Sequence, residues 1–204
     1  MPESPASPGL TRILAVAERL FGDRGYDGVS IGDVAGEAGV SKANVFHHFA
    51  DKQTLYERVL ADACARLDVE LKPALDIDAD ARGRIAHIVA SYRRYLRSHP
   101  STARLLLREL IDHRDCADSG RAFELFVRLL DKLAAPMREA RVGGDFHYEI
   151  NPTLVASMLL GITLFDAQTE HLRDAIAALR DVDEDSVSML TDLLLDGLLR
   201  ERVA

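Results

Sequence analysis

The feature that most constrains the fold is the recurrence of apolar residues at helical spacing along nearly the whole chain. Ile13, Ala17 and Leu20 follow one another at intervals of four and three residues, and the same intervals continue among the leucines of residues 186–201. An alternation of apolar and polar residues, which would indicate strands, never extends beyond a few positions. With only seven prolines and 13 glycines in 204 residues, the sequence predicts an all-α fold of about nine helices.

Cap and stop residues divide the first part of the chain into four helices. Gly25 and Gly39 each follow a periodic segment, and a glycine just past a helix is a common C-terminal signal. Ser30 occupies an N-cap position with Asp33 three residues later, close to a capping box, and Ser41 precedes the next helix. The predicted helices span residues 11–24, 31–38, 41–49 and 52–71, with Asp51 as the cap of the fourth and Pro73 as its end. Two short helices joined through a glycine indicate a helix-turn-helix, whose second helix can enter a DNA major groove.

The rest of the chain is expected to be helical as well. Further helices are predicted at residues 79–97, 101–114, 119–141, 151–172 and 184–202. The expected division is a disordered tail (residues 1–9), a helix-turn-helix domain (residues 10–56) and a second helical domain (residues 57–204).

Charge and cysteine content bear on whether the protein can bind DNA and on the compartment in which it is expected. The net charge of −8 at pH 7 would disfavour DNA binding if it were spread evenly, but residues 9–56 are close to neutral, and only nearby charges act on a phosphate. Cys64 and Cys116 form no CxxC pair, which indicates a reducing compartment. The start lacks a secretory signal, and the uncharged stretch 150–165 is shorter than the roughly 20 residues that a bilayer requires. We therefore expect a cytoplasmic protein with no membrane association.

The block "ILAVAERLFGDRGYDGVSIGDVAGEAGVSKANVFHHFADKQTLYERVL" (residues 13–60) resembles the DNA-binding domain of the TetR family of bacterial transcriptional regulators. The joint pattern carries the resemblance, at Phe21, Gly25, Tyr26, Ile31, Val34, Ala35, Gly39, Val40, Ser41, Phe46, Phe49, Lys52 and Leu55. The resemblance implies an all-helical homodimer whose two recognition helices bind a palindromic DNA operator. It also implies that residues 57–204 bind a small molecule, which releases the DNA, and form the dimer.

On this basis we expect a ligand-released repressor with no enzymatic activity, no cofactor and no metal. A DNA-binding regulator that needs no ligand, or an activator, is the alternative, and a solidly filled second domain would favour it. A helical enzyme or ligand-storage protein is a third possibility. The sequence contains no GxSxG, P-loop or HExxH motif that would support an enzyme.

Residues expected to contact DNA lie on the face of helix 41–49 that is opposite its core residues, Val45 and Phe49. Asn44 suits a base edge, above all the bidentate pair with adenine, and Lys42 and Lys52 flank the helix where each could neutralise a phosphate. Plain solvation is the alternative for all three, as capping is for Ser30. The full expected set is Ser30, Ser41, Lys42, Ala43, Asn44, Phe46, His47 and Lys52.

Phe46 departs from the family pattern, which usually has a tyrosine whose hydroxyl reaches a phosphate. The phenyl ring packs either on a sugar or a thymine methyl, or on its own helix. His47 and His48 are adjacent, and adjacent helical residues point about 100° apart, so we predict no metal site. His47 is expected to face DNA, and His48 to pack at the edge between helices.

Two further sites are expected within residues 57–204. A cavity for a lipophilic or aromatic ligand is expected among the middle helices, with the candidates Tyr92, Tyr95, Leu106, Leu110, His113, Phe123, Phe126, Met158 and Phe165. The last two helices are apolar over more than half of their circumference, which indicates a dimer interface. Its expected residues are Leu154, Met158, Gly161, Phe165, Leu190, Leu194, Gly197 and Leu198. Plain core within one subunit is the alternative for each set.

Overall fold

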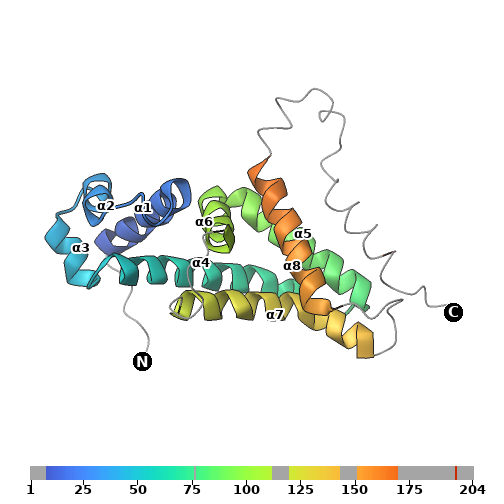
Figure 1. The fold of residues 1–204 in the computed structure, drawn as a ribbon. Helices are drawn as coiled ribbons and strands as arrows, with labels where there is room; N and C mark the ends of the chain where they lie inside the picture. The colour runs from blue at the N-terminus through green and yellow to red at the C-terminus, as the bar shows by residue number, and fades with distance from the viewer. Residues whose placement is uncertain (1–7, 76, 112–119, 143–150, 170–195, 197–204) are drawn as a thin grey trace, which may run out of the picture. The chain divides into compact units, whose positions relative to one another are not determined.

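The computed structural model describes residues 8–75, 77–111, 120–142, 151–169 and 196, and these residues are built from α-helices without strands (Figure 1). The helices are α1 (Pro8–Arg24), α2 (Ile31–Ala38), α3 (Lys42–His48), α4 (Lys52–Leu75), α5 (Ala81–Ser98), α6 (Pro100–Ile111), α7 (Gly120–Val142) and α8 (Pro152–Gln168). The prediction of an all-α fold is confirmed. The ninth predicted helix, at residues 184–202, lies outside the described residues except for Asp196.

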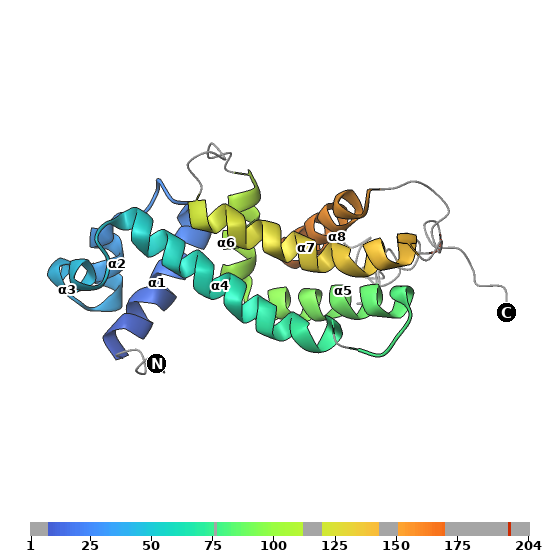
Figure 2. The same ribbon diagram turned by 90° about the horizontal axis from the view of Figure 1, so that it is seen from below.

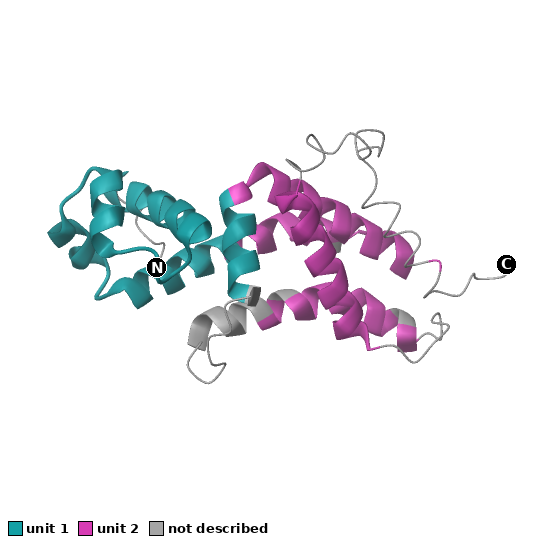
Figure 3. Cartoon of the chain, turned by 45° about the horizontal axis from the view of Figure 1, so that its top comes forward, with its two compact units in different colours: residues 1–64, 101–123 teal, residues 65–100, 124–204 magenta. Residues whose placement is uncertain are grey.

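The chain divides into two compact units, coloured separately in Figure 3. The N-terminal unit comprises residues up to 64 together with 101–123, and the C-terminal unit comprises residues 65–100 and those from 124 onward. Helices α4 and α7 therefore contribute to both units, and α6 belongs almost entirely with the helix-turn-helix. The unit that holds the helix-turn-helix thus includes more of the chain than residues 10–56.

Short helices of the N-terminal unit begin at side-chain caps, as the sequence predicts. Ser30 Oγ accepts a hydrogen bond from the Asp33 amide at 3.1 Å, and Asp33 Oδ2 accepts one from the Ser30 amide at 2.8 Å, which completes a capping box. Gly39 ends α2 with a positive φ of 66°, and Ser41 Oγ accepts from the Asn44 amide at 3.1 Å. Isolated helices of seven or eight residues are unstable in water, so these caps and the buried faces hold α2 and α3 in place.

An aromatic cluster ties the end of α1 to α4 within the N-terminal unit. Phe21 meets Tyr56 edge-on with ring centroids 5.1 Å apart, and Tyr26 meets Tyr56 edge-on at 5.2 Å. Such edge-to-face pairs add to the free energy gained from burial alone. The apolar residues around them form the core, namely Ile13, Ala17, Leu20, Val29, Val34, Ala35, Ala38, Val45, Leu55, Val59 and Leu60.

Helix α6 packs closely against the C-terminal turn of α1. A Cβ atom placed on Gly22 would lie 2.8 Å from the Ser101 carbonyl oxygen, so a glycine is required for this approach. Arg108 Nε donates to the Gly22 carbonyl at 2.8 Å and Arg108 Nη2 to the Asp23 carbonyl, also at 2.8 Å. Arg108 thus satisfies two carbonyl groups at the helix end that have no partner within α1.

The C-terminal unit is built around α5, the later part of α7, and α8 (Figure 2). Helices α5 and α8 pack directly on each other, and a buried ion pair joins them, with Arg93 Nε 3.0 Å from Asp166 Oδ2. Proline lies inside two helices: Pro136 within α7, and Pro73 within the last turn of α4. Helix α4 continues to Leu75, four residues past the predicted end, because a proline disrupts only the hydrogen bond to the preceding turn. None of the described helices is long and apolar enough to cross a membrane.

Candidate nucleic-acid interface and apolar pocket

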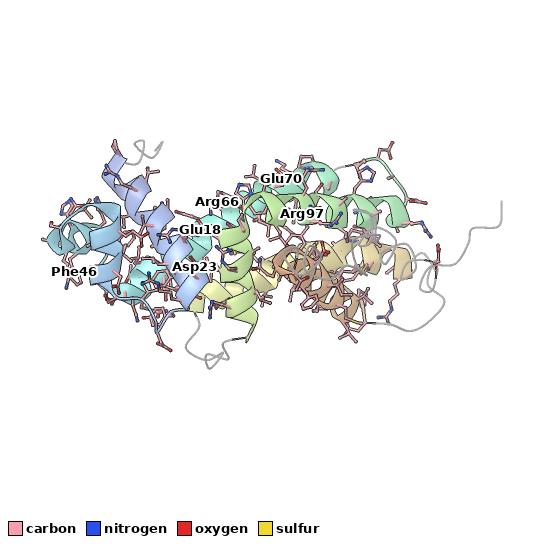
Figure 4. The ribbon with its side chains drawn as sticks, turned by 90° about the horizontal axis from the view of Figure 1, so that it is seen from above. Glu18, Asp23, Phe46, Arg66, Glu70 and Arg97 are labelled. Carbon is pink, nitrogen blue, oxygen red and sulfur yellow. The ribbon has the colours of Figure 1, made fainter. Side chains whose placement is uncertain are left out.

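One face of α3 is buried and the other is open. Val45 has no exposed surface and Phe49, which follows the helix, is 6% exposed, so both belong to the core as predicted. The predicted contact residues on the opposite face are exposed, including Phe46 at 52% (Figure 4); they are Ser41, Lys42, Ala43, Asn44, Phe46 and His47. An exposed helical face of this width, held rigidly from behind, has the geometry that major-groove reading requires.

The Lys42 side chain reaches back from α3 to the first turn of α2. A Cβ atom placed on Gly32 would lie 3.0 Å from Lys42 Nζ and 3.4 Å from Ser30 Oγ. The ammonium group therefore lies beside the amide groups that begin α2, where the helix dipole also attracts an anion. The structure brings Lys42 and Ser30 together, which the sequence left as two separate candidates.

The hydroxyl of Ser30 is engaged within its own capping box. Ser30 Oγ lies 2.5 Å from Asp33 Oδ2 and donates its proton to that carboxylate. This hydrogen bond, and then the one from the Ser30 amide, lowers the pKa of the Asp33 carboxyl below its usual value. The Ser30 hydroxyl can donate to a phosphate only if its hydrogen bond to Asp33 breaks. The contact of Ser30 with DNA therefore stays a prediction.

Lys52 folds against Tyr26. Its Nζ atom donates to the Tyr26 carbonyl at 3.1 Å and lies 4.0 Å from the centre of the tyrosine ring, an attractive cation–π position. An ammonium group has three donors, so the phosphate contact predicted for Lys52 stays a prediction alongside its role in holding the loop after α1. No sequence pattern indicated this contact, because residues 26 and 52 are far apart along the chain.

The two histidines interact with rings rather than with metal-ligating groups. The rings of His47 and His48 lie edge-on with centroids 5.1 Å apart, and His48 also lies near Phe49 at 6.3 Å. Over the ranges that the structure describes, no three His, Cys, Asp or Glu side chains form a group that could hold a metal ion. His48 is half-buried and His47 is exposed, which leaves only His47 available on the outer face.

Arg12 is a further cation near the reading face. Its Nη1 atom lies 3.9 Å from a Cβ atom placed on Gly39, in the turn that joins α2 to α3. The side chain is exposed and the residue lies in the first half of α1. The only sequence signal for such a role of Arg12 was its position outside the apolar stripe of α1. That position does not distinguish it from an arginine that is merely solvated.

An apolar pocket lies in the C-terminal unit between α5, α7 and α8. Its empty space, including the open mouth, is about 290 Å³. The wall is apolar apart from the hydroxyls of Tyr92 and Thr163, and Thr163 Oγ1 donates at 2.7 Å to the Leu159 carbonyl. The lining residues are Ile85, Ile88, Val89, Tyr92, Leu133, Met137, Ala156, Leu159, Leu160 and Thr163. Among the described residues this wall offers no charged partner, and it suits a neutral, apolar molecule.

The structure brings one predicted pocket residue, Tyr92, to this lining. Tyr95 is buried and stacks on His99 with centroids 4.3 Å apart, while Leu106 is buried in the N-terminal unit. Met158 and Phe165 are 52% and 65% exposed. The other candidates, His113 and the side chains of Leu110, Phe123 and Phe126, lie outside the described residues.

Predicted dimer residues on α8 form an exposed apolar stripe. Leu154 is 58% exposed, and Met158 and Phe165 follow it at helical spacing on the same side. A Cβ atom placed on Gly161 would touch nothing within 4 Å, so this part of the stripe is open. Leu190, Leu194, Gly197 and Leu198 lie outside the described residues.

Residues 13–59 match the family of bacterial regulatory proteins called the tetR family. This segment contains α2 and α3 with most of α1 and the start of α4. It is the same region that the sequence pattern singled out.

Similar proteins include the transcriptional repressor KstR2 of Mycolicibacterium smegmatis, which is 35% identical over 63 residues. That match covers 30% of this chain and 31% of KstR2. Among solved structures, the TetR-family regulator PfmR of Thermus thermophilus is 25% identical, with a TM-score of 0.71 over 93% of this chain and 97% of PfmR. FadR of Bacillus subtilis in complex with stearoyl-CoA shares the fold at 17% identity, with a TM-score of 0.72 over 92% of this chain and 98% of FadR.

Proposed function

We propose that this chain, which belongs to the tetR family of bacterial regulatory proteins through residues 13–59, is a repressor that binds a palindromic DNA operator as a homodimer. An apolar small molecule in the pocket of the C-terminal unit releases the DNA. The repressor role, the dimer and the ligand go beyond family membership and are the subject of the experiments below.

The observation that carries the proposal is the exposed face of α3. Asn44 and His47 project from a helix whose opposite side is fixed by the buried Val45. Lys42 lies beside the N-terminus of α2, where a DNA phosphate would meet both the ammonium and the helix dipole. Base contacts from Asn44 would then supply sequence specificity, while the phosphate contacts set the position of the helix in the groove.

The small reading surface of one recognition helix and the exposed face of α8 support a homodimer. One recognition helix makes few base contacts, whereas two helices related by a two-fold axis read two half-sites of a palindrome. The exposed stripe of Leu154, Met158 and Phe165 on α8 provides an apolar surface that a second subunit can cover. We therefore propose that α8 contributes to the dimer interface, together with the predicted helix at residues 184–202.

The pocket wall supports a neutral, apolar ligand. FadR of Bacillus subtilis has been solved with stearoyl-CoA, whose acyl chain is apolar. Ten of the described residues line the pocket here, and among them Tyr92 and Thr163 supply the polar side-chain atoms. A charged group of any ligand would therefore have to remain outside this wall, because its burial without a partner is costly.

Coupling between ligand and DNA requires that the ligand favour one arrangement of the protein over another. Helix α5 supplies four of the pocket residues and is followed, after His99 alone, by α6. Helix α6 in turn is held on α1 by Arg108. We propose that a change at α5 reaches the DNA-binding face through α6.

The test of DNA binding is fluorescence anisotropy with a duplex taken from upstream of the protein's own coding sequence. Asn44→Ala should weaken specific binding by roughly 10- to 100-fold, the effect of losing one bidentate base contact. Lys42→Ala should weaken binding to all sequences and reduce the slope of log affinity against log salt by about one unit. Lys72→Ala removes the same charge from the last turn of α4 and should leave that slope unchanged.

Ligand release is tested with the complex of protein and duplex. Native mass spectrometry of the purified protein identifies molecules that copurify with it, and each is then added to the complex. Release of the DNA by an apolar ligand predicts that the duplex dissociates as the pocket fills. Filling of the pocket without loss of DNA affinity would instead support the ligand-independent regulator, and absence of binding to any duplex would refute the proposal.

A further inference from the structure

The pocket of the C-terminal unit is nearly closed, although the proposed function requires it to admit a ligand. Its empty space of about 290 Å³ includes the open mouth, and the enclosed part has room for only about one water molecule. Pockets that bind small molecules typically have about 300–1,000 Å³. One of the three walls, α5, α7 or α8, must therefore move when a ligand enters.

Helices α5 and α8 are the walls that resist separation. Their ion pair is desolvated, since the side chains of Arg93 and Asp166 are 14% and 8% exposed. Pulling the helices apart would leave a carboxylate and a guanidinium in a largely apolar setting, which is strongly unfavourable. The pocket residues Val89 on α5 and Leu160 on α8 are both buried.

Helix α7 is held by ion pairs that water already reaches. Glu139 is 60% exposed and its partner on α5, Arg84, is 22% exposed, so water reaches the carboxylate of this pair. Lys132 Nζ lies 2.8 Å from Asp68 Oδ1 on α4, and these side chains are 40% and 38% exposed. Exposed pairs contribute little to stability, because water solvates each partner when the pair separates.

Pro136 interrupts α7 at the pocket itself. It is buried and lies between Leu133 and Met137, which both line the pocket. Proline has no amide hydrogen, so the Lys132 carbonyl lacks its usual helical partner, and the ring pushes against the preceding turn. A helix bends most easily where a backbone hydrogen bond is missing.

From these contacts we infer that α7 is the wall that opens, by bending at Pro136 so that residues 137–142 swing away and Met137 leaves the pocket. The inference rests on the proposed function, since it concerns how the ligand of that pocket enters. The Arg84–Glu139 pair acts as the exposed latch of this movement. Helices α5 and α8 remain together throughout.

Hydrogen exchange of the ligand-free protein tests the hinge without any ligand. Backbone amides of residues 133–141 should exchange faster than equally buried amides of α5 and α8. Pro136→Ala restores the missing backbone hydrogen bond and should slow the exchange of this segment by about fivefold. Pro73→Ala, in the exposed last turn of α4, is the matched control and should leave exchange in α7 unchanged. Exchange in α7 as slow as in α5 and α8 would overturn the hinge.

Entry is measured by stopped-flow fluorescence with the neutral apolar probe N-phenyl-1-naphthylamine. Pro136→Ala should slow association of the probe by about fivefold, and Glu139→Gln, which weakens the latch, should accelerate it. The Glu139 variant keeps the test decisive if Pro136→Ala alters folding. Equal association rates in all variants, with normal equilibrium binding, would refute the hinge while supporting the pocket. Failure of the wild-type protein to bind the probe would refute both the apolar pocket and its gate, and would leave the DNA-binding proposal standing.

Discussion

The two units are stabilised by different kinds of interaction. In the N-terminal unit, α2 begins at a capping box, ends at a glycine with φ of 66°, and is followed by a serine-capped α3. In the C-terminal unit, α8 carries apolar residues around most of its circumference and packs on α5 by burial and one desolvated ion pair. Short helices need specific local signals to exist, whereas long apolar helices need only a partner surface. The difference predicts that the two units respond differently to substitution.

The largest effect is expected from the buried ion pair of the C-terminal unit. Asp166→Asn leaves the mostly buried Arg93 without its carboxylate, and should lower the free energy of unfolding by about 3 kcal/mol or more. Urea denaturation followed by circular dichroism measures the loss. Glu139→Gln, which removes the exposed carboxylate of the partly exposed pair with Arg84, is the control and should cost less than about 1 kcal/mol. Equal losses of unfolding free energy in the two variants would show that the burial of an ion pair does not determine its contribution to stability here.

The close approach of α1 and α6 should give the next largest effect. Gly22→Ala places a Cβ atom 2.8 Å from the Ser101 carbonyl oxygen, and should lower the free energy of unfolding by about 1–3 kcal/mol. The matched control is Gly36→Ala in α2, where a Cβ atom would meet nothing within 4 Å. That substitution should instead stabilise the protein by up to about 1 kcal/mol, the helix-propensity difference between the two residues. A stabilising Gly22→Ala would mean that α6 does not pack rigidly on α1.

The same contrast explains what could be predicted from the sequence. Ser30, Gly39 and Ser41 mark helix ends by their positions along the chain alone. The helix-turn-helix could therefore be located from the sequence, and its core residue Val45 assigned. The pocket depends on which faces of α5, α7 and α8 meet, and apolar spacing alone does not reveal this. Among the predicted pocket residues whose side chains the structure describes, Tyr92 is therefore the one found in the lining.

Long-range polar contacts could not be predicted from the sequence either. The hydrogen bonds from Arg108 to the carbonyls of Gly22 and Asp23 join residues more than 80 positions apart. Nothing in the local pattern distinguishes Arg108 from a solvated arginine on α6. The same holds for Lys52, which was expected at a phosphate and lies over Tyr26.

A smaller effect, confined to the N-terminal unit, is expected at Phe46. This exposed ring occupies the position where the family pattern usually has a phosphate-binding tyrosine. Phe46→Tyr adds a hydroxyl that can donate to a phosphate, and should tighten DNA binding by about threefold to tenfold, the net effect of one ordinary hydrogen bond. Anisotropy titration measures the gain, and binding of N-phenyl-1-naphthylamine to the C-terminal unit should not change. An unchanged DNA affinity would place residue 46 away from the phosphates.

The smallest effect concerns the pH dependence of the capping box. Hydrogen bonds from the Ser30 hydroxyl and amide lower the pKa of Asp33 in the folded protein. The cap therefore contributes its full stability at pH values above the usual carboxyl pKa, and loses it as the pH falls through the lower folded value, because the unfolded chain then binds the proton more readily. Asp33 is exposed, so the effect on global unfolding is slight, but the helix that it caps positions α3. Asp33→Asn should flatten the decline in DNA affinity on acidification below about pH 5. Acidification should leave the uncharged pocket wall unaffected, so a parallel decline in probe binding would show that low pH acts on both units rather than on the cap.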